Sequence, residues 1–390
     1  MDRRKFAKTA LGAIAGGALI SKANASPKQV EAVKPTDKPR ELNPKLQNDL
    51  AQEQIKVIQS KRGYRHQGKK GANGKNPLEG KCTSLLLFAD VHLVYEHLAV
   101  IRDFYNTHKK YIDDAVHLGD TVGDFLMPPF DFWDVFPNAL NVIGNHDTDT
   151  GRTQRAVLSD RDKYDTYFKK YISSWNVVQP ENAEAEGKCY WYKDYNNDVR
   201  LIGVDCMRIA KISWSSKNDE ESQKKQMQWF KETLADAREK NLRVVVATHI
   251  SPTVKEKDIV KCNFSTLDYS SSVDGVCNKF LPAIDEFIEA GGTFVSWICG
   301  HDHHDLVGYA SNAKHKQLVF IFECATDFSW WTDANHVKNT ETAGCWTLFA
   351  VESITNIIKL TRFGNNFDHY MRHKGTFCYD FKNHKIISQY

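Results

Sequence analysis

The 390-residue sequence predicts an α/β fold in which two β-sheets pack together. Two observations support this prediction. From Thr83 onward, short apolar runs alternate with amphipathic segments of helical period, a pattern typical of a mostly parallel α/β sheet. After Gln317 the runs become mainly β, which indicates a second sheet packed on the first. Because no internal repeat is visible, we expect one catalytic domain.

Each expected strand is a short apolar run, and each expected helix has apolar residues recurring every three to four positions. The strands expected before Gln317 are residues 84–88, 115–118, 141–143, 201–204, 244–247 and 294–298. Those expected after it are residues 318–322, 345–351 and 354–361. The expected helices are residues 96–113, 160–174, 219–240 and 281–290.

The composition is that of a globular protein, with 41% apolar and 26% charged residues. The formal charge of +3 is concentrated at the N-terminus. The first 25 residues carry five basic residues and one acidic residue, so the remainder has a formal charge of −1. A nearly neutral chain gives no electrostatic reason to expect nucleic acid or membrane binding.

The N-terminus predicts an export signal over residues 1–25. A basic start precedes an apolar run over residues 9–20 and the small-residue site Ala23-Asn24-Ala25. The run is too short to span a bilayer, so no stable membrane anchor is expected after cleavage. Residues 2–8, with Arg3 and Arg4, resemble a twin-arginine signal, which implies the twin-arginine translocation machinery as a partner. The alternative is a general secretory signal, and both place the mature protein in the periplasm or outside the cell.

Residues 26–80 are polar and predict a linker or peripheral arm, followed by the catalytic domain over residues 81–390. The nine cysteines form no CxxC pair, which argues against a zinc knuckle. Cys262 and Cys277 lie in a Ser-rich insert and are candidates for a disulfide in an oxidising compartment. Two unpaired cysteines are the alternative.

Side chains that bind metals follow five of the expected strands. They occur in the groups Asp90-Val91-His92, Gly119-Asp120, Gly144-Asn145-His146-Asp147, His249 and Gly300-His301-Asp302-His303. The carboxyl ends of parallel strands meet at one edge of a sheet, where α/β proteins bind ligands. The sequence therefore predicts one cleft formed by five loops.

These groups suit first-row metal ions. Carboxylates, imidazoles and an amide oxygen bind such ions, and the lack of thiolates in the five groups argues against structural zinc. Two ions roughly 3.5–4 Å apart can share a carboxylate and a hydroxide and hold the oxygens of an in-line displacement. We therefore expect a binuclear site.

The ordered groups D-x-H, G-D, G-N-H-D, H and G-H-x-H resemble the calcineurin-like metallophosphoesterases over about residues 84–305. The resemblance implies a two-sheet α/β/β/α sandwich with its metal site at the carboxyl ends of the strands. It implies two divalent or trivalent ions of Mn, Fe or Zn held by seven side chains: Asp90, His92, Asp120, Asn145, His249, His301 and His303. One ion would be bound by Asp90, His92 and His303, and the other by Asn145, His249 and His301, with Asp120 shared. His146 would protonate the leaving oxygen.

The resemblance further implies a phosphoesterase in which a hydroxide bound between two ions attacks a phosphodiester or phosphomonoester. The expected substrate is a small-molecule, lipid or nucleotide phosphate ester. Protein phosphatases of this superfamily carry an acid three positions after G-D and then a phosphate-binding arginine. Here Gly123 and Asp124 follow instead, without that arginine, which disfavours phosphoprotein substrates and slightly favours diesters. Purple acid phosphatases are disfavoured because their first group lacks the D-x-H histidine.

The alternative functions are a binding protein that keeps the fold without turnover and a nuclease. The complete set of ligand positions argues against the first, and the lack of a basic stripe argues against the second. Two aromatic segments, residues 125–133 and 328–331, either pack over the core or stack on a substrate.

Overall fold

The computed structural model describes most of the chain after residue 81. The described residues are 82–92, 95–122, 132–148, 158–209, 220–262, 264, 276–322, 325, 344–364 and 376–389. All of them belong to one compact unit, Leu42–Tyr390. The expected signal peptide, the linker, Asp124 and the segment 328–331 lie outside the described residues. Of the segment 125–133, only the backbone of its last two residues is described.

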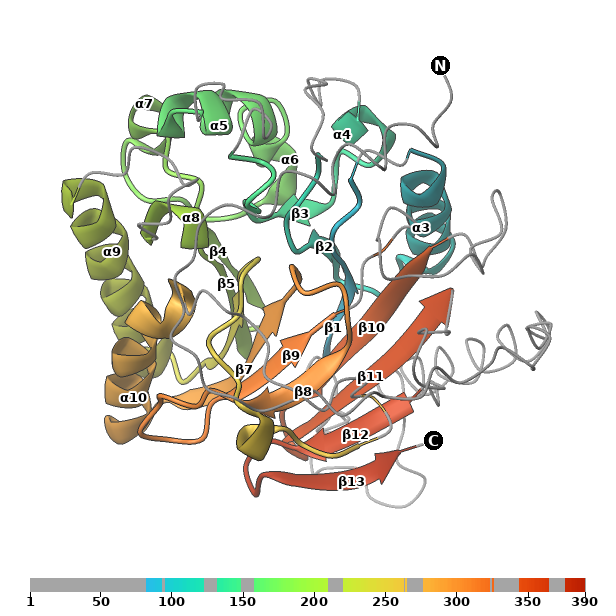
Figure 1. The fold of residues 1–390 in the computed structure, drawn as a ribbon, viewed down its shortest axis with the longest axis vertical. Coiled ribbons are helices and arrows are strands. Elements are labelled where there is room, and N and C mark those ends of the chain that lie inside the picture. Colours follow the sequence, from blue (N-terminus) through green and yellow to red (C-terminus); the bar gives the residue numbers. More distant parts are fainter. Residues whose placement is uncertain are drawn as a thin grey trace, which may run out of the picture. The chain divides into compact units, whose positions relative to one another are not determined.

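Two β-sheets form the centre of the described fold (Figure 1). The first has seven strands in the order β13-β12-β11-β10-β1-β2-β3, and the second has six in the order β4-β5-β6-β7-β9-β8. The strands of the first sheet are β1 (Cys82–Phe88), β2 (Asp114–His117), β3 (Leu140–Asn141), β10 (Cys345–Glu352), β11 (Ile357–Gly364), β12 (Thr376–Asp380) and β13 (Lys385–Gln389). Those of the second are β4 (Trp191–Tyr195), β5 (Val199–Gly203), β6 (Arg243–Ala247), β7 (Thr293–Cys299), β8 (Leu306–Tyr309) and β9 (Leu318–Ile321). The expected two-sheet α/β fold is confirmed.

The division of strands between the sheets differs from the expectation. β1 pairs in parallel with β2 and antiparallel with β10, so the first strands share a sheet with the last ones. β9, which follows Gln317, instead pairs in parallel with β7. The sequence of β1 accounts for its central place, since Leu85, Leu86 and Leu87 are all essentially buried. A continuous apolar strand that is covered on both faces needs a hydrogen-bonded partner at each edge.

Helices cover the outer faces of the sheets. α3 (Tyr95–His108) packs on the first sheet, where the ring of Phe104 lies 5.3 Å from Trp346 and 4.8 Å from Phe363. α9 (Glu220–Glu239) and α10 (Leu281–Glu289) lie beside the second sheet (Figure 1). Both match their predicted ranges within one residue at each end. α3 ends five residues earlier than predicted.

The helix predicted over residues 160–174 is broken into α5 (Asp160–Tyr167) and α6 (Ile172–Trp175). The N–H of Lys169 donates to the carbonyl of Tyr164 at 2.9 Å, a six-to-one bond typical of a helix C-terminus. The remaining short elements are α4 (Phe132–Val135), α7 (Ala183–Glu186), α8 (Cys206–Ile209), η2 (Glu256–Asp258) and η3 (Val276–Phe280).

Aromatic side chains fill the space between the two sheets. The ring of Phe320 on β9 lies 6.1 Å from Phe349 on β10 and 6.3 Å from Phe377 on β12. All three side chains are fully buried. Because each ring removes a large apolar area from water, this layer binds the sheets together and fixes the distance between their carboxyl ends.

The disulfide considered between Cys262 and Cys277 is not formed, because Cys277 is a free thiol. Cys277 lies in η3, turned into the core, with its Sγ 3.3 Å from the hydroxyl oxygen of Thr248. Burial raises the pKa of Cys277 well above its ordinary value, so the thiol is held as a neutral core group.

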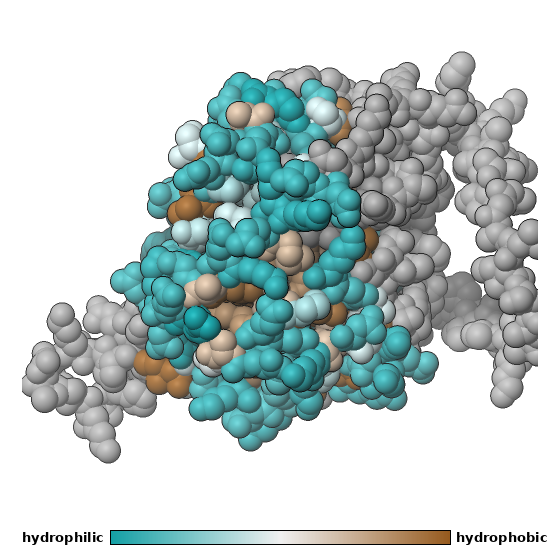
Figure 2. Space-filling view, turned by 90° about the vertical axis from the view of Figure 1, so that its left-hand side faces the viewer, coloured by the Kyte–Doolittle hydropathy of each residue, from teal (hydrophilic) through white to brown (hydrophobic). Residues whose placement is uncertain are grey.

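The face shown in Figure 2 is largely hydrophilic, with hydrophobic residues gathered in a recess near the middle of its described part. A shallow groove between α9 and α10 is lined by Leu234, Ala235, Ala283 and Phe287 among others, and none of its lining residues comes from the five expected ligand groups. No helix in the described parts of the chain is long and apolar enough to cross a membrane.

Candidate metal centre

The side chains singled out in the sequence lie on loops at the carboxyl ends of five strands. Asp90 and His92 follow β1, Asp120 follows β2, Asn145 and His146 follow β3, His249 follows β6, and His301 and His303 follow β7. β1, β2 and β3 run parallel in the first sheet, and β6 and β7 run parallel in the second. The packing of the two sheets therefore brings the five loops to one place.

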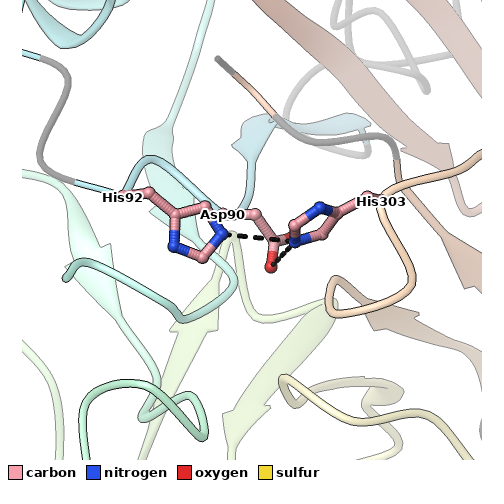
Figure 3. A group of neighbouring side chains, drawn as sticks. All are labelled: Asp90, His92 and His303. Atoms are coloured by element: carbon pink, nitrogen blue, oxygen red, sulfur yellow. Dashed lines mark hydrogen bonds and ion pairs between the residues drawn. The ribbon is translucent and has the colours of Figure 1, made fainter. Parts of the chain in front are cut away.

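One group consists of Asp90, His92 and His303, whose ligand atoms lie within 4.8 Å of one another. Figure 3 shows the carboxylate of Asp90 and both imidazoles directed toward a common point. Nε2 of His303 lies 3.2 Å from Oδ1 of Asp90 and 3.2 Å from Nε2 of His92. Two nitrogens and a carboxylate oxygen are thus close enough together to bind one ion.

The second group consists of Asp120, His249 and His301, again with ligand atoms within 4.8 Å of one another. Nε2 of His249 lies 3.2 Å from Oδ2 of Asp120 and 2.9 Å from Oδ1 of Asn145. The same nitrogen is 4.0 Å from Oδ1 of Asp90, which belongs to the first group. The two groups are therefore adjacent.

The histidine tautomers fit a metal. Nδ1 of His92 lies 3.0 Å from the carbonyl oxygen of Val122, and Nδ1 of His249 lies 2.7 Å from that of Leu118. A carbonyl oxygen only accepts, so each Nδ1 donates, and Nε2 is the ring nitrogen that faces the site and that binds a metal when it carries no proton. The lone pairs of His92 and His303 at 3.2 Å repel unless a cation or a proton lies between them. The hydrogen bond from Nδ1 to a carbonyl oxygen is the contact that orients metal-binding histidines in proteins.

The charges of the site also favour a cation. Asp90, Asp120 and His249 are all essentially buried. Burial disfavours a charged ring, but the carboxylates of Asp120 and Asp90 outweigh it and raise the pKa of His249 to about 10. Buried carboxylates stabilise positive charge at the position that a metal ion would occupy, and the mixture of oxygen and nitrogen donors suits first-row ions.

The backbone of the site is strained at the expected ligands. Five of the seven have a positive φ angle: Asp90 (55°), His92 (48°), Asp120 (59°), His301 (76°) and His303 (57°). Each such conformation costs about 1–3 kcal/mol in a residue other than glycine, and it persists only where the surroundings enforce it. The concentration of these angles in one cluster is typical of a functional site.

Asp147 holds two of the loops together, a role that the sequence analysis missed. Its Oδ2 accepts the N–H groups of Asp120 at 3.0 Å and Gly144 at 2.9 Å. Its Oδ1 accepts those of Thr121 at 2.9 Å and Val122 at 3.3 Å. Asp147 therefore ties the backbone of the Asp120 loop to that of the Gly144 loop. Its position directly after the Gly-Asn-His triplet was the available signal.

Glycines allow the loops to approach one another closely. A Cβ on Gly144 would lie 2.1 Å from Oδ1 of Asp120, and one on Gly119 would lie 2.6 Å from Nδ1 of His249. Gly119 also has a φ of 93°, which disfavours any side chain. Both glycines are required by the packing of the site itself.

His146 lies at the border of the two groups and reaches solvent, with 26% of its side chain exposed. Its Nε2 is 3.8 Å from Oδ2 of Asp120, and its backbone N–H donates to Oδ1 of the same residue at 2.8 Å. The ring also meets that of His92 edge to face, with 5.1 Å between centroids. His146 is therefore close to both groups while remaining accessible from outside.

The family model of the calcineurin-like phosphoesterases matches residues 83–305, which is more than half of the chain. The chain belongs to this family. This phosphoesterase is a metal-dependent hydrolase of phosphoric ester bonds, and the family implies divalent metal ions. No curated protein matches the sequence.

Several solved structures resemble this phosphoesterase at low identity. A dimetal phosphatase from Danio rerio is 10% identical, with 75% of this chain and 99% of that chain covered and a TM-score of 0.46. A protein described as the anchor in the inner membrane complex of Plasmodium is 12% identical, with 75% and 89% covered and a TM-score of 0.44. A phosphatase from Mycoplasma pneumoniae is 11% identical, with 79% and 92% covered and a TM-score of 0.35.

Proposed function

We propose that this phosphoesterase holds two first-row metal ions of Mn, Fe or Zn and hydrolyses a phosphodiester or phosphomonoester. The proposed ligands are Asp90, His92, Asp120, Asn145, His249, His301 and His303. The observation that carries the proposal is the pair of adjacent groups, each with a buried carboxylate and two imidazoles whose ligand atoms lie within 4.8 Å. When bound, such a pair supplies Lewis acidity and an activated water for in-line attack on phosphorus.

Asp120 is the proposed shared ligand. Its Oδ2 lies 3.2 Å from Nε2 of His249 in one group. The same carboxylate also favours the protonated form of His92 in the other group. Burial lowers the pKa of His92, and the nearby Asp120 is the strongest opposing influence on that ring. A carboxylate that acts on a ring of each group is suitably placed to serve both ions.

His146 is the proposed general acid. It lies within 4 Å of the Asp120 carboxylate, it contacts His92, and 26% of its side chain is exposed, against 16% for that of His303. A group that donates a proton to a leaving oxygen must reach the substrate from the open side of the site. Residues 121–125, directly after Gly119-Asp120, contain no arginine to hold a monoester dianion, which favours a diester substrate.

The proposal is tested by metal analysis and by the His146→Ala variant. Purified protein should contain about two ions per chain, and fewer than one would refute the binuclear site. His146→Ala should keep its ions and lose about 10²- to 10⁴-fold in rate on alkyl esters, with a much smaller loss on nitrophenyl esters. A leaving group that departs readily as an anion needs little protonation. Loss of metal, or an equal loss of rate on both esters, would exclude the general-acid role.

We also propose that residues 1–25 are a cleaved twin-arginine signal, that residues 81–390 form the catalytic domain, and that the mature enzyme is exported. The support is the sequence pattern around Arg3 and Arg4 and the small-residue site before Ser26. N-terminal sequencing of exported protein should begin at Ser26. The Arg3→Lys/Arg4→Lys variant should be retained in the cytoplasm, and normal export of that variant would favour the general secretory pathway.

A further inference from the structure

The loop between β7 and β8 carries two proposed ligands in a strained conformation. His301 and His303 have φ angles of 76° and 57°. At its start the loop is held by Gly300, whose N–H donates to the carbonyl of His249 at 3.0 Å, and by His301, whose N–H donates to Oδ2 of Asp90 at 3.1 Å. The ladder of β8 with β9 begins only at Leu306. His303 lies between these two anchor points.

Asp305, two residues after His303, anchors the loop on the β8 side. Its carboxylate is fully buried and forms an ion pair with Nη2 of Arg362 on β11. β11 belongs to the seven-stranded sheet, whereas β8 belongs to the six-stranded sheet. The ion pair therefore ties the ligand loop of one sheet to a strand of the other.

The guanidinium of Arg362 is itself held in place. Its Nη1 lies 3.1 Å from Sγ of Cys345 at the start of β10, and it lies 5.5 Å from the centroid of the Phe264 ring. Only 1% of the side chain is exposed. A planar group that is fixed on several sides presents its N–H donors to Asp305 in one orientation, which a flexible ammonium does not.

Stability alone does not explain such a pair. Taking two opposite charges out of water costs about as much as their attraction returns, so a buried ion pair contributes little net stability and is more useful for fixing a geometry. Arg362 also lies beyond residues 83–305, the segment matched by the family model. It is therefore not part of the matched ligand motifs.

We propose that Arg362 is a positioning residue that acts through Asp305 to hold His303 toward Asp90, and that it thereby sets the affinity of the Asp90, His92 and His303 group. This inference rests on the proposed ligand roles. The effect is selective because His301 has an anchor of its own in its hydrogen bond to Asp90. The group of Asp120 and His249 receives no support from Arg362 in the described contacts.

The test measures metal retention in the holoenzyme. Protein is dialysed against increasing concentrations of a chelator, and the ions left per chain are counted by elemental analysis. Residues that orient metal ligands typically change affinity by about 10- to 100-fold when substituted. Arg362→Gln should release one ion at a chelator concentration at least about tenfold lower than the wild type, and the other ion at an unchanged concentration. Arg362→Lys keeps the charge without the planar group. It should release the first ion at a chelator concentration between those of Arg362→Gln and the wild type.

Arg200→Gln is the matched control. Arg200 on β5 is also a fully buried guanidinium, paired with Asp194 at 2.6 Å and Asp236 at 2.7 Å, but it contacts none of the ligand loops in the described structure. Its loss should lower the unfolding temperature and leave the release of both ions unchanged. If Arg200→Gln and Arg362→Gln weaken metal retention alike, Arg362 has only a structural role.

A double variant keeps the inference testable if Arg362→Gln alone does not fold. Asp305→Asn/Arg362→Gln removes both charges, so that no unpaired charge remains buried, and it should show the same selective loss as Arg362→Gln alone because the pair acts as one unit. Unchanged retention of both ions in the double variant, or equal weakening of both, would overturn the inference. Wild-type protein that holds fewer than one ion would instead refute the proposed function.

Discussion

Asp147→Asn is the sharpest test of how the metal loops are held. The carboxylate of Asp147 is fully buried and accepts four backbone N–H groups. The substitution keeps the shape of the side chain but converts one of its two acceptor atoms into an NH₂ donor. If that atom takes the place of Oδ2, it faces the N–H groups of Asp120 and Gly144, which then lose their acceptor.

The magnitude follows from those two bonds. Each hydrogen bond to a charged group contributes about 1.5–3 kcal/mol net, so losing two costs about 3–6 kcal/mol. The unfolding free energy of a whole protein is only about 5–15 kcal/mol. We therefore expect Asp147→Asn to lower the unfolding free energy by about 3 kcal/mol or more and to loosen the loop that presents Asp120.

The assay combines urea unfolding, followed by circular dichroism, with metal retention against a chelator. Asp147→Asn should unfold at lower urea and release its ions at lower chelator concentration than the wild type. Asp380→Asn is the control. Asp380 also accepts two backbone N–H groups, from Lys382 at 3.0 Å and Asn383 at 2.9 Å, but at the turn between β12 and β13. It should leave metal retention unchanged.

Wild-type unfolding and wild-type retention in Asp147→Asn would refute this reasoning. Reduced stability with unchanged retention would show that Asp147 stabilises the fold without positioning the ligands. Only the joint loss, absent from Asp380→Asn, supports the role assigned to Asp147.

Two further substitutions test the arrangement of the ligands. Asp120→Ala should lose both ions more readily than His303→Ala, because a shared carboxylate serves both sites, and elemental analysis showing equal retention in the two variants would contradict the sharing. Gly119→Ala should lower the unfolding free energy by at least about 2 kcal/mol, because its φ of 93° is strained with a side chain and its Cβ would lie 2.6 Å from Nδ1 of His249. A urea midpoint equal to that of the wild type would contradict this expectation.

The sequence signal for the proposed site is local. Each proposed ligand lies within a few residues of an apolar strand, and parallel strands bring their carboxyl ends together whatever the order of the strands. The prediction of converging loops therefore did not depend on which strands share a sheet, and the structure divides the strands differently from the expectation. α9 and α10 were also predicted closely, because a long amphipathic period is a strong helical signal.

Four strands were missed for different physical reasons. β8 contains Gly308 and directly follows a ligand loop, so it has little apolar pattern of its own. β4 is buried only at its two ends, and Lys193 and Asp194 between them weaken its apolar character. β12 and β13 are short, and they form a hairpin at one end of the first sheet. Short strands of this kind are stabilised by their neighbours more than by their own composition.

The residues that position the ligands are the hardest to predict, and the ion pair of Asp305 and Arg362 shows why. The two residues are 57 positions apart and meet only because β11 lies in the sheet that packs against β8. No local pattern marks either of them, since an isolated aspartate after a histidine motif and an arginine in a strand both have common structural explanations. The identity of a ligand is determined by its chemistry, and ligands recur at strand ends. The identity of a positioning residue depends instead on which side chains the packing of the two sheets brings beside it. The first can be found from a motif, and the second requires the relative placement of the two sheets.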